Sequence, residues 1–408
     1  MRFRLIIDPA DTIAISDGRP FNQADAGRAI SASVFPPPPN TLYGAARVAC
    51  ARALGWRGYG NWSKKNPEIV GTMGSQDTPG QFKISGPFFR AGENDLLPLP
   101  SHAVLRREGV KTQIILRTPH SEDTKTDLGE VPLPFVSPYQ QGVSYKRLDG
   151  RWGRADAVVR LLAGETVHPD DLGRPKELGW PEPCNNLALP NRPQSLPGWS
   201  LCDLAAEEYR VGIARVPDTH LAADGQLYAS VRRAVRQDVQ MFVEVEGLDP
   251  PKDMNIAVPF GGEARFAFIS NDNRQLPGMP SSVQGNYLIY LATPTVLSAM
   301  AADHDLQPTA DSNESSADQR RPISELEAWE TLLDLPGKLV MASVNGVTTH
   351  AGRENNADGK GTRSKAKAVL PAGSVLFMQA NGEVTLTSER LGEETHMGYG
   401  RYIAGVWE

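Results

Sequence analysis

The feature that most restricts the fold of this chain is a glycine cluster that leads into its last apolar segment. Gly392 is followed, after five intervening residues, by Gly398-Tyr399-Gly400, and the apolar run at 401–407 comes next. Because glycine has no Cβ, it adopts positive φ readily and lets a second backbone approach closely. The cluster therefore predicts a loop where something is gripped by main-chain amides, followed by a C-terminal strand. A tight hairpin turn is the simpler alternative.

Strand patterns dominate the rest of the chain. Alternation of apolar and polar residues predicts strands at 2–7 and 239–246. Shorter apolar runs predict further strands at 264–269, 287–292, 339–344, 374–379 and 401–407. Residues 229–237 fit either a short helix or an extended segment. Strands outnumber the helices, which are separated along the sequence, so an α+β class is expected.

Two segments have the apolar spacing of a helix. Residues 41–54 carry small apolar residues on one face, with Asn40 as the expected N-cap and Gly55 at the expected C-terminal cap. Residues 322–335 form a second apolar stripe. The small residues of the first helix would let it pack closely on a sheet.

A chain of 408 residues predicts two domains, which we divide at 1–208 and 209–408. Within the first, residues from about 57 to 208 show no clear periodicity and are interpreted as a long insertion and connector. The seven prolines in 169–200 favour surface loops. In the second, the polar stretch 303–320 is expected to be disordered.

Charge and composition narrow the function classes. The net charge of −6 argues against a uniformly basic nucleic-acid-binding surface, but residues 360–367 contain four Lys or Arg and no acid. No run is long and apolar enough to cross a membrane, and the N-terminus lacks the pattern of a signal peptide, so a cytoplasmic protein is expected. Cys50, Cys184 and Cys202 form no CxxC pair and are expected to be buried free thiols.

The glycine cluster resembles the glycine-rich loop near the C-terminus of the RAMP superfamily of CRISPR RNA-binding proteins. The family form is glycine, hydrophobic, glycine, then five residues that usually include Lys or Arg, then glycine, hydrophobic, glycine. This chain departs from it in two ways. Arg390 replaces the first glycine, and the five-residue insert contains no Lys or Arg.

Four further segments, in family order, resemble the RAMP subunit that caps the Cmr-type (type III-B) effector complex. They are Ser16-Asp17-Gly18-Arg19-Pro20-Phe21; Phe35-Pro36-Pro37 with Thr41-Leu42-Tyr43-Gly44-Ala45-Ala46-Arg47; Gly212-Ile213 with residues 224–228 and 261–265; and Val369-Leu370-Pro371-Ala372-Gly373-Ser374-Val375. The matches reach from one end of the chain to the other, although 57–208 and 303–320 match poorly.

This resemblance implies an α+β fold of two ferredoxin-like (RRM-like) βαββαβ domains with long loop insertions. It implies a non-enzymatic subunit of an antiviral ribonucleoprotein that binds the 5′ repeat-derived tag of the guide RNA. The implied partners are that RNA, the large polymerase/cyclase-like subunit and a backbone RAMP subunit. No cofactor, metal or membrane association is implied.

The basic segment 350–368 is the strongest RNA candidate, because glycines let it follow a phosphate backbone that its cations can neutralise. Its candidate contacts are His350, Arg353, Lys360, Arg363, Lys365 and Lys367. The other candidates are Arg19, Gly44, Arg47, Gly261, Gly262, Arg265, Arg390, Gly392, His396, Gly398 and Gly400. Each has a plainer interpretation: a solvated loop, a Glu263–Arg265 arrangement that fixes its turn, or a structural arginine. Arg232, Arg233 and Arg236 would share one face if helical.

Other functions stay open at this point. A guide-processing endoribonuclease would use His220, His350 or His396 as an acid or base, but no second catalytic partner can be assigned. Asp17 and Asp224 lie in Asp-Gly turns, where carboxylates usually bond local amides rather than a metal. A paralogous tag-binding subunit from another type III subtype is a close alternative. A protein-docking scaffold with a basic loop is the third.

Overall fold

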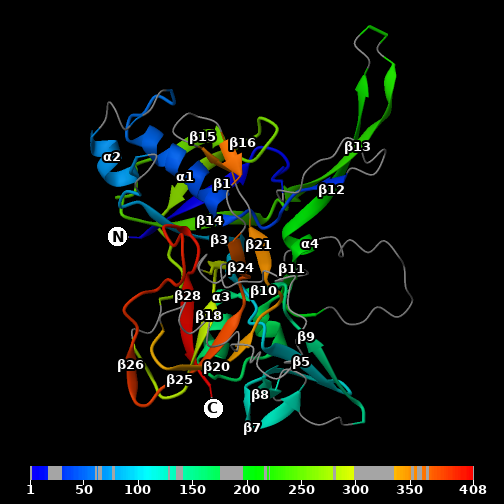
Figure 1. The fold of residues 1–408 in the computed structure, drawn as a ribbon, viewed down its shortest axis with the longest axis vertical. Coiled ribbons are helices and arrows are strands. Elements are labelled where there is room, and N and C mark those ends of the chain that lie inside the picture. Colours follow the sequence, from blue (N-terminus) through cyan, green and yellow to red (C-terminus); the bar gives the residue numbers. More distant parts are fainter. Residues whose placement is uncertain are drawn as a thin grey trace, which may run out of the picture.

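The computed structural model describes the chain in segments separated by gaps (Figure 1). These are residues 2–16, 30–59, 62, 67–75, 79–126, 129–134, 141–174, 196–215, 218–219, 221–278, 282–297, 335–350, 353–355, 361–363 and 367–407. Strands far outnumber helices in these ranges, which confirms the expected mixed, strand-rich fold. Residues 322–334 of the second predicted helix and the polar stretch 303–320 lie outside them. None of the described helices is long and apolar enough to span a membrane.

A nine-stranded main sheet organises the first part of the molecule. In spatial order it contains β11 (Trp199–Ser200), β10 (Arg151–Arg154), β4 (Asn94–Pro98), β3 (Lys83–Ala91), β14 (Val239–Glu246), β1 (Phe3–Pro9), β16 (Phe266–Asp272) and β15 (Asn255–Pro259), with β27 (Met397–Gly398) added beside β3. Strand β1 is antiparallel to both of its neighbours, β14 and β16. A boundary at residue 208 therefore passes between strands of one sheet.

Helix α1 (Pro39–Ala53) packs on one face of the main sheet, as the small residues of its sequence predict (Figure 1). The alternating side chains of β1, which include Phe3 and Leu5, are buried in this core. Gly55 follows the helix with φ of +94°, as expected of a C-terminal cap. The prediction of Asn40 as N-cap is wrong. The helix begins at Pro39, and Pro38 occupies the N-cap position without a side-chain capping bond.

A four-stranded sheet forms the centre of the second part. Its spatial order is β20 (Lys338–Ser343), β25 (Val375–Gln379), β18 (Tyr287–Leu291) and β28 (Tyr402–Val406). The run β3-β14-β1-β16 of the main sheet has the same arrangement, in which the first strand along the chain lies between the third and the fourth. A core that includes Phe242, Phe377 and helix α3 (Ala155–Leu162) joins the two sheets.

Residues 57–208, which gave no clear sequence pattern, contribute much of this framework. Strand β3 lies near the middle of the main sheet, and its residues after Lys83 are all buried. The same region contains the short helices α2 (Pro67–Met73) and α4 (Leu201–Leu204) and a 3-10 helix at Pro169–Leu172. It also contains β5 (Ala103–Glu108), β6 (Lys111–Leu116), β9 (Val143–Arg147), β7 (Pro119–Thr126) and β8 (Gly129–Pro134). Of the proline-rich stretch 169–200, the part at 175–195 lies outside the described residues.

A long hairpin extends from the body of the molecule (Figure 1). It is formed by β12 (Ala205–Arg215) and β13 (Ala222–Val235), with β2 (Ile30–Ala32) parallel to β13 at its root. Residues 229–235 are therefore extended rather than helical, and Arg232 and Arg233 lie on a strand. We call this hairpin the arm.

Smaller strands complete the second part. They are β17 (Ser282–Gln284) with β26 (Glu383–Thr385), β19 (Thr295–Val296) and β21 (Thr348–His350) on either side of β24 (Lys367–Leu370), and β22 (Arg353–Asn355) with β23 (Gly361–Arg363). Cys50 is buried, but Cys202 is exposed, so the expectation of buried thiols holds for only one of the two described cysteines.

Candidate functional site

The glycine cluster is a compact loop held by the chain's own backbone. Gly400 has φ of +76°, and a Cβ at this position would lie 1.9 Å from the carbonyl oxygen of Leu391. Gly392 has φ of +75°, and a Cβ there would lie 2.3 Å from the oxygen of Val296. The Leu391 amide donates to Gly400 O at 2.9 Å, and the Gly400 amide donates to Pro294 O at 2.8 Å. Packing within the protein therefore requires glycine at both positions.

The loop lies against β3 and the beginning of α1. Strand β27 pairs in parallel with β3, and the Ile84 amide donates to His396 O at 3.1 Å. A Cβ on Gly398 would lie 3.2 Å from Pro39 at the first turn of α1. Tyr399 is buried at this junction, and that burial is the main cause of a pKa well above its usual value.

His396 is half-buried at this junction. Its ring meets Tyr43 edge-on, with ring centroids 5.5 Å apart. Burial lowers the pKa of His396, and Arg47, Lys83 and Arg390 lower it further, against the opposing effect of Glu394. The imidazole is therefore neutral near pH 7 and can donate and accept a hydrogen bond without carrying charge.

Arg390, which replaces the first glycine of the family pattern, lies beneath the loop. Its guanidinium donates to Ser85 Oγ at 3.0 Å and to Glu246 at 3.1 Å. Glu246 also pairs with Arg2 at 2.9 Å. Burial is the main cause of the lowered pKa of Arg390. This side chain ties the loop to the main sheet, which accounts for its position without any ligand.

Arg47 and Gly44 differ in what surrounds them on α1. The Arg47 guanidinium donates to Met73 O at 2.9 Å and Ser75 O at 2.6 Å, and it lies 5.0 Å from the centre of the Trp62 ring. It therefore joins α1 to the end of α2. A Cβ on Gly44 would meet nothing within 4 Å, so packing among the described residues does not require glycine there.

The turn at Gly261–Arg265 is fixed by contacts inside the protein. The Gly262 amide donates to Ala14 O at 2.7 Å. The Arg265 guanidinium donates to Asp11 at 2.6 Å and to Thr12 O at 3.0 Å, and it also lies 3.6 Å from Glu263. Arg265 is the main cause of a lowered pKa at Asp11. The predicted Glu263–Arg265 arrangement that fixes the turn is therefore present, and it also includes Asp11.

The predicted arginine face is part of the arm instead. Arg232 pairs with Glu263, Arg233 pairs with Glu207 at 2.8 Å, and Arg236 donates to the carbonyl of Cys202. Because β13 is extended, these side chains do not share a helix face. Arg232 and Arg236 link the root of the arm to the body, whereas the Arg233–Glu207 pair lies within the arm.

The described parts of the basic segment form a β-hairpin ladder. His350 lies opposite Lys367 in β21 and β24, and Arg353 lies opposite Arg363 in β22 and β23. Lys367 reaches the glycine loop, where its amine lies 2.6 Å from Glu394 and 3.7 Å from Glu393. Arg19, Lys360, Lys365 and His220 lie outside the described residues, as do Asp17 and Cys184.

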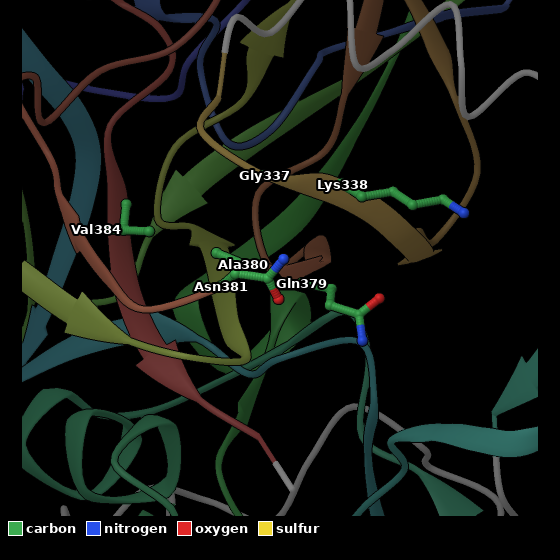
Figure 2. Close-up of a pocket in the computed structure, with 6 residues that line it drawn as sticks. All are labelled: Gly337, Lys338, Gln379, Ala380, Asn381 and Val384. Atoms are coloured by element: carbon green, nitrogen blue, oxygen red, sulfur yellow. The ribbon is translucent and has the colours of Figure 1, made fainter.

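Elsewhere, a cavity of about 580 Å³ opens beside the β25–β26 turn (Figure 2). It is lined by Gly337, Lys338, Gln379, Ala380, Asn381 and Val384. None of these was predicted as a site residue, and Lys338 extends its amine away from the other labelled side chains in Figure 2. Among the described residues, no three His, Cys, Asp or Glu side chains gather in a metal-binding arrangement.

Comparison with known proteins identifies the family. A family described as CRISPR-associated protein (Cas_Cmr3) matches residues 5–407. The chain belongs to this family. No curated protein matches it.

The Cas_Cmr3 chain also has distant likenesses among solved structures. Two are chains of the type III-B Cmr-beta complex bound to cognate target RNA, one of them also with AMPPnP. They have 16% and 15% identity, a TM-score of 0.44, and coverage of 92% of this chain and 86% of theirs. A third is from a Csm3–Csm4 subcomplex of a type III-A CRISPR-Cas interference complex, with 9% identity, a TM-score of 0.37 and coverage of 100% and 99%.

Sequence reasoning missed how this Cas_Cmr3 chain brings the candidates together. The first turns of α1, β3, Lys367 and the glycine loop meet at one place, although they are distant in sequence. Lys83 also belongs here, because its charge contributes to the lowered pKa of His396. The only sequence signal for Lys83 was its place beside the short apolar piece that becomes β3.

Proposed function

We propose that this Cas_Cmr3 chain is an RNA-binding scaffold subunit of a type III-B CRISPR effector complex. In this proposal it binds the 5′ repeat-derived tag of the guide RNA at the foot of the complex. It lies beside the large polymerase/cyclase-like subunit and a backbone RAMP subunit, and acts in the cytoplasm. It has no catalytic activity of its own and needs no cofactor.

One observation carries this proposal: Lys367 joins the basic hairpin to the glycine loop. Its ion pairs with Glu393 and Glu394 place the end of the 350–368 segment against residues 390–400. The two elements chosen independently as RNA candidates are thus parts of one surface.

The electrostatics of this surface suit a modest, shared contact. Glu393 and Glu394 neutralise Lys367, and the net charge of the chain is −6. Further positive charge near His396 comes from Arg47, Lys83 and Arg390. We therefore expect weak binding by the isolated chain and tighter binding when a neighbouring subunit supplies further phosphate contacts.

The strand order supports the finer proposal about the fold. In β3-β14-β1-β16 the order along the chain is 2-3-1-4, and all neighbours are antiparallel. In β20-β25-β18-β28 the order is again 2-3-1-4. This is the order of a ferredoxin-like βαββαβ unit, and α1 occupies the first crossover of the main sheet. We propose two such units, with β15 in place of the second crossover helix of the first unit.

The test is a salt series of binding between tag RNA and the purified chain, alone and with its large partner subunit. One variant changes Lys360, Arg363, Lys365 and Lys367 to Ala. A matched control removes four exposed cations elsewhere: Arg57, Lys111, Lys252 and Lys338. Each lost phosphate contact on a single strand lowers the slope of log K against log salt by about 0.7, so four contacts lower it by about 2.8.

We expect the hairpin variant to lose between one and four such contacts while the control keeps the wild-type slope. Equal slopes in the two variants would remove RNA binding from the hairpin. Absence of binding with the partner present would instead favour a protein-docking scaffold. Cleavage of repeat RNA without metal, lost on changing His220, His350 or His396 to Ala, would establish the nuclease alternative.

A further inference from the structure

Two large aromatic side chains are exposed on the outer face of the main sheet. Phe266 is 47% exposed and Phe268 is 42% exposed. They are two residues apart on β16 and therefore project from the same face of the strand. The residues that alternate with them, Ala267 and Ile269, are fully buried against the α1 side of the sheet. The two rings therefore form a small apolar patch on this face of the sheet.

The neighbours of these rings leave them accessible. Asp8 and Ala257 lie directly opposite Phe268 on the flanking strands, and Pro259 lies opposite Phe266. Asp8, Ala257 and Pro259 are themselves exposed and short, so they do not cover the rings. The ring centroids are 5.6 Å apart and the ring planes meet at 83°, so each ring offers its face in a different direction.

We infer that Phe266 and Phe268 form a stacking platform for unpaired bases of the RNA that this chain binds. This inference rests on the proposed function and adds a second kind of contact to it. Aromatic residues at alternate positions on an exposed sheet face are how RNA-recognition modules stack bases. The local sequence Phe266-Ala267-Phe268 has the succession of aromatic, small and aromatic residues that also occurs in a sheet motif of those modules.

The size of the patch favours bases over a protein partner. A Phe side chain offers roughly 150–250 Å² when fully exposed, so at these exposures the pair presents about 200 Å². A stable protein interface buries about 800 Å² on each partner. The patch is bounded by Asp8 and by Asn255, which is exposed on β15. Two rings surrounded by polar groups match one or two stacked bases and fall well short of the apolar centre of a protein interface.

The platform is also held rigidly. Arg265, the residue before Phe266, donates to Asp11 and Thr12 O and so fixes the start of β16 to the end of β1. The Phe260 amide donates to Arg265 O at 2.9 Å and closes the turn before the strand. A preorganised platform loses little side-chain entropy when a base stacks on it.

The test uses tag RNA with 2-aminopurine at single positions, bound to the purified chain with its large partner subunit. The variant is Phe266→Ala/Phe268→Ala. The matched control is Phe266→Tyr/Phe268→Tyr, which keeps both rings, and Val110→Ala removes an exposed apolar side chain elsewhere. Urea midpoints of all variants are measured first, so that a folding defect is separated from a binding defect.

Stacking contributes enough that each lost ring is expected to weaken binding by about 5- to 150-fold. At the stacked position, 2-aminopurine emission is quenched with wild type and with the tyrosine control, and restored with the alanine variant. RNA that is abasic at that position binds the wild type as weakly as intact RNA binds the alanine variant. The salt slope does not change, because no phosphate contact is removed.

Three results would overturn the inference. The first is normal affinity and normal quenching in the alanine variant. The second is an equal loss of affinity for intact and abasic RNA. The third is normal RNA binding with loss of the partner subunit from the reconstituted complex, which would make this face a protein contact. In each of these the wild type still binds tag RNA, whereas failure of the wild type to bind would refute the proposed function itself.

Discussion

Replacing Gly400 with Ala tests whether the glycine loop is shaped by the protein's own packing. At φ of +76° any L-residue is strained by about 1–2 kcal/mol. In addition, the new Cβ would lie 1.9 Å from Leu391 O, so the two backbones must separate by roughly 1 Å to reach an allowed contact. That movement disrupts the hydrogen bonds from the Leu391 amide to Gly400 O and from the Gly400 amide to Pro294 O, at about 1 kcal/mol each.

We therefore expect Gly400→Ala to lower the free energy of unfolding by about 3–4 kcal/mol. Gly346→Ala is the matched control, because Gly346 has φ of +79° but a Cβ there would meet nothing within 4 Å. It should lose only the strain of about 1–2 kcal/mol. Urea unfolding with unchanged m-values measures both. If the two variants lose stability equally, within about 0.5 kcal/mol, the argument from close backbone approach is wrong.

Two further variants test a buried histidine and a partly buried arginine. His102 is fully buried edge-on to Phe377, and burial lowers its pKa to about 3 from 6.5. Between those pH values the histidine is protonated in the unfolded chain but neutral in the folded one. The free energy of unfolding is therefore at its full value above pH 6.5 and falls by about 1.4 kcal/mol per pH unit below it. Urea midpoints at pH 7.5 and pH 5.0 should show a deficit of about 2 kcal/mol that His102→Leu abolishes, and a deficit that persists in this variant would contradict the assignment. Arg47→Met removes the donors to Met73 O and Ser75 O and should lower the free energy of unfolding by about 2 kcal/mol. The salt slope of RNA binding should not change. A slope reduced by about 0.7 would instead show that Arg47 contacts a phosphate.

The sequence predicted strands best where one face meets the core and the other meets polar surroundings. Alternation located β1 and β14, and small-residue spacing located α1. Strand β3 was not predicted, because it is buried on both faces and its apolar and polar residues therefore do not alternate. In addition, Gly86 and Pro87 interrupt its apolar run. The proposed N-cap at Asn40 failed because the helix begins at Pro39, a residue suited to the first helical position, so Asn40 already lies within the first turn.

The sequence predicted which segments form the candidate site. It did not predict which of their side chains are already paired within the protein. The partners of Arg390 and Arg265 are Glu246 and Asp11, which lie 144 and 254 residues away. No local pattern reveals such pairs, so these arginines looked available for RNA. Conversely, Phe266 and Phe268 belonged to a predicted strand whose two faces the pattern could not assign to core and solvent.

The position of β1 in the main sheet has a consequence for synthesis of the chain. Residues 3–9 leave the ribosome long before the strands on either side of them, because β14 and β16 end at residues 246 and 272. More than half of the polypeptide must therefore be made before the first strand acquires its neighbours. During that interval an apolar segment with two unpaired edges is exposed to the crowded cell, and it is a natural target for chaperones. Such long-range pairing also slows folding, so assembly of the complex proposed above would wait on the folding of this chain.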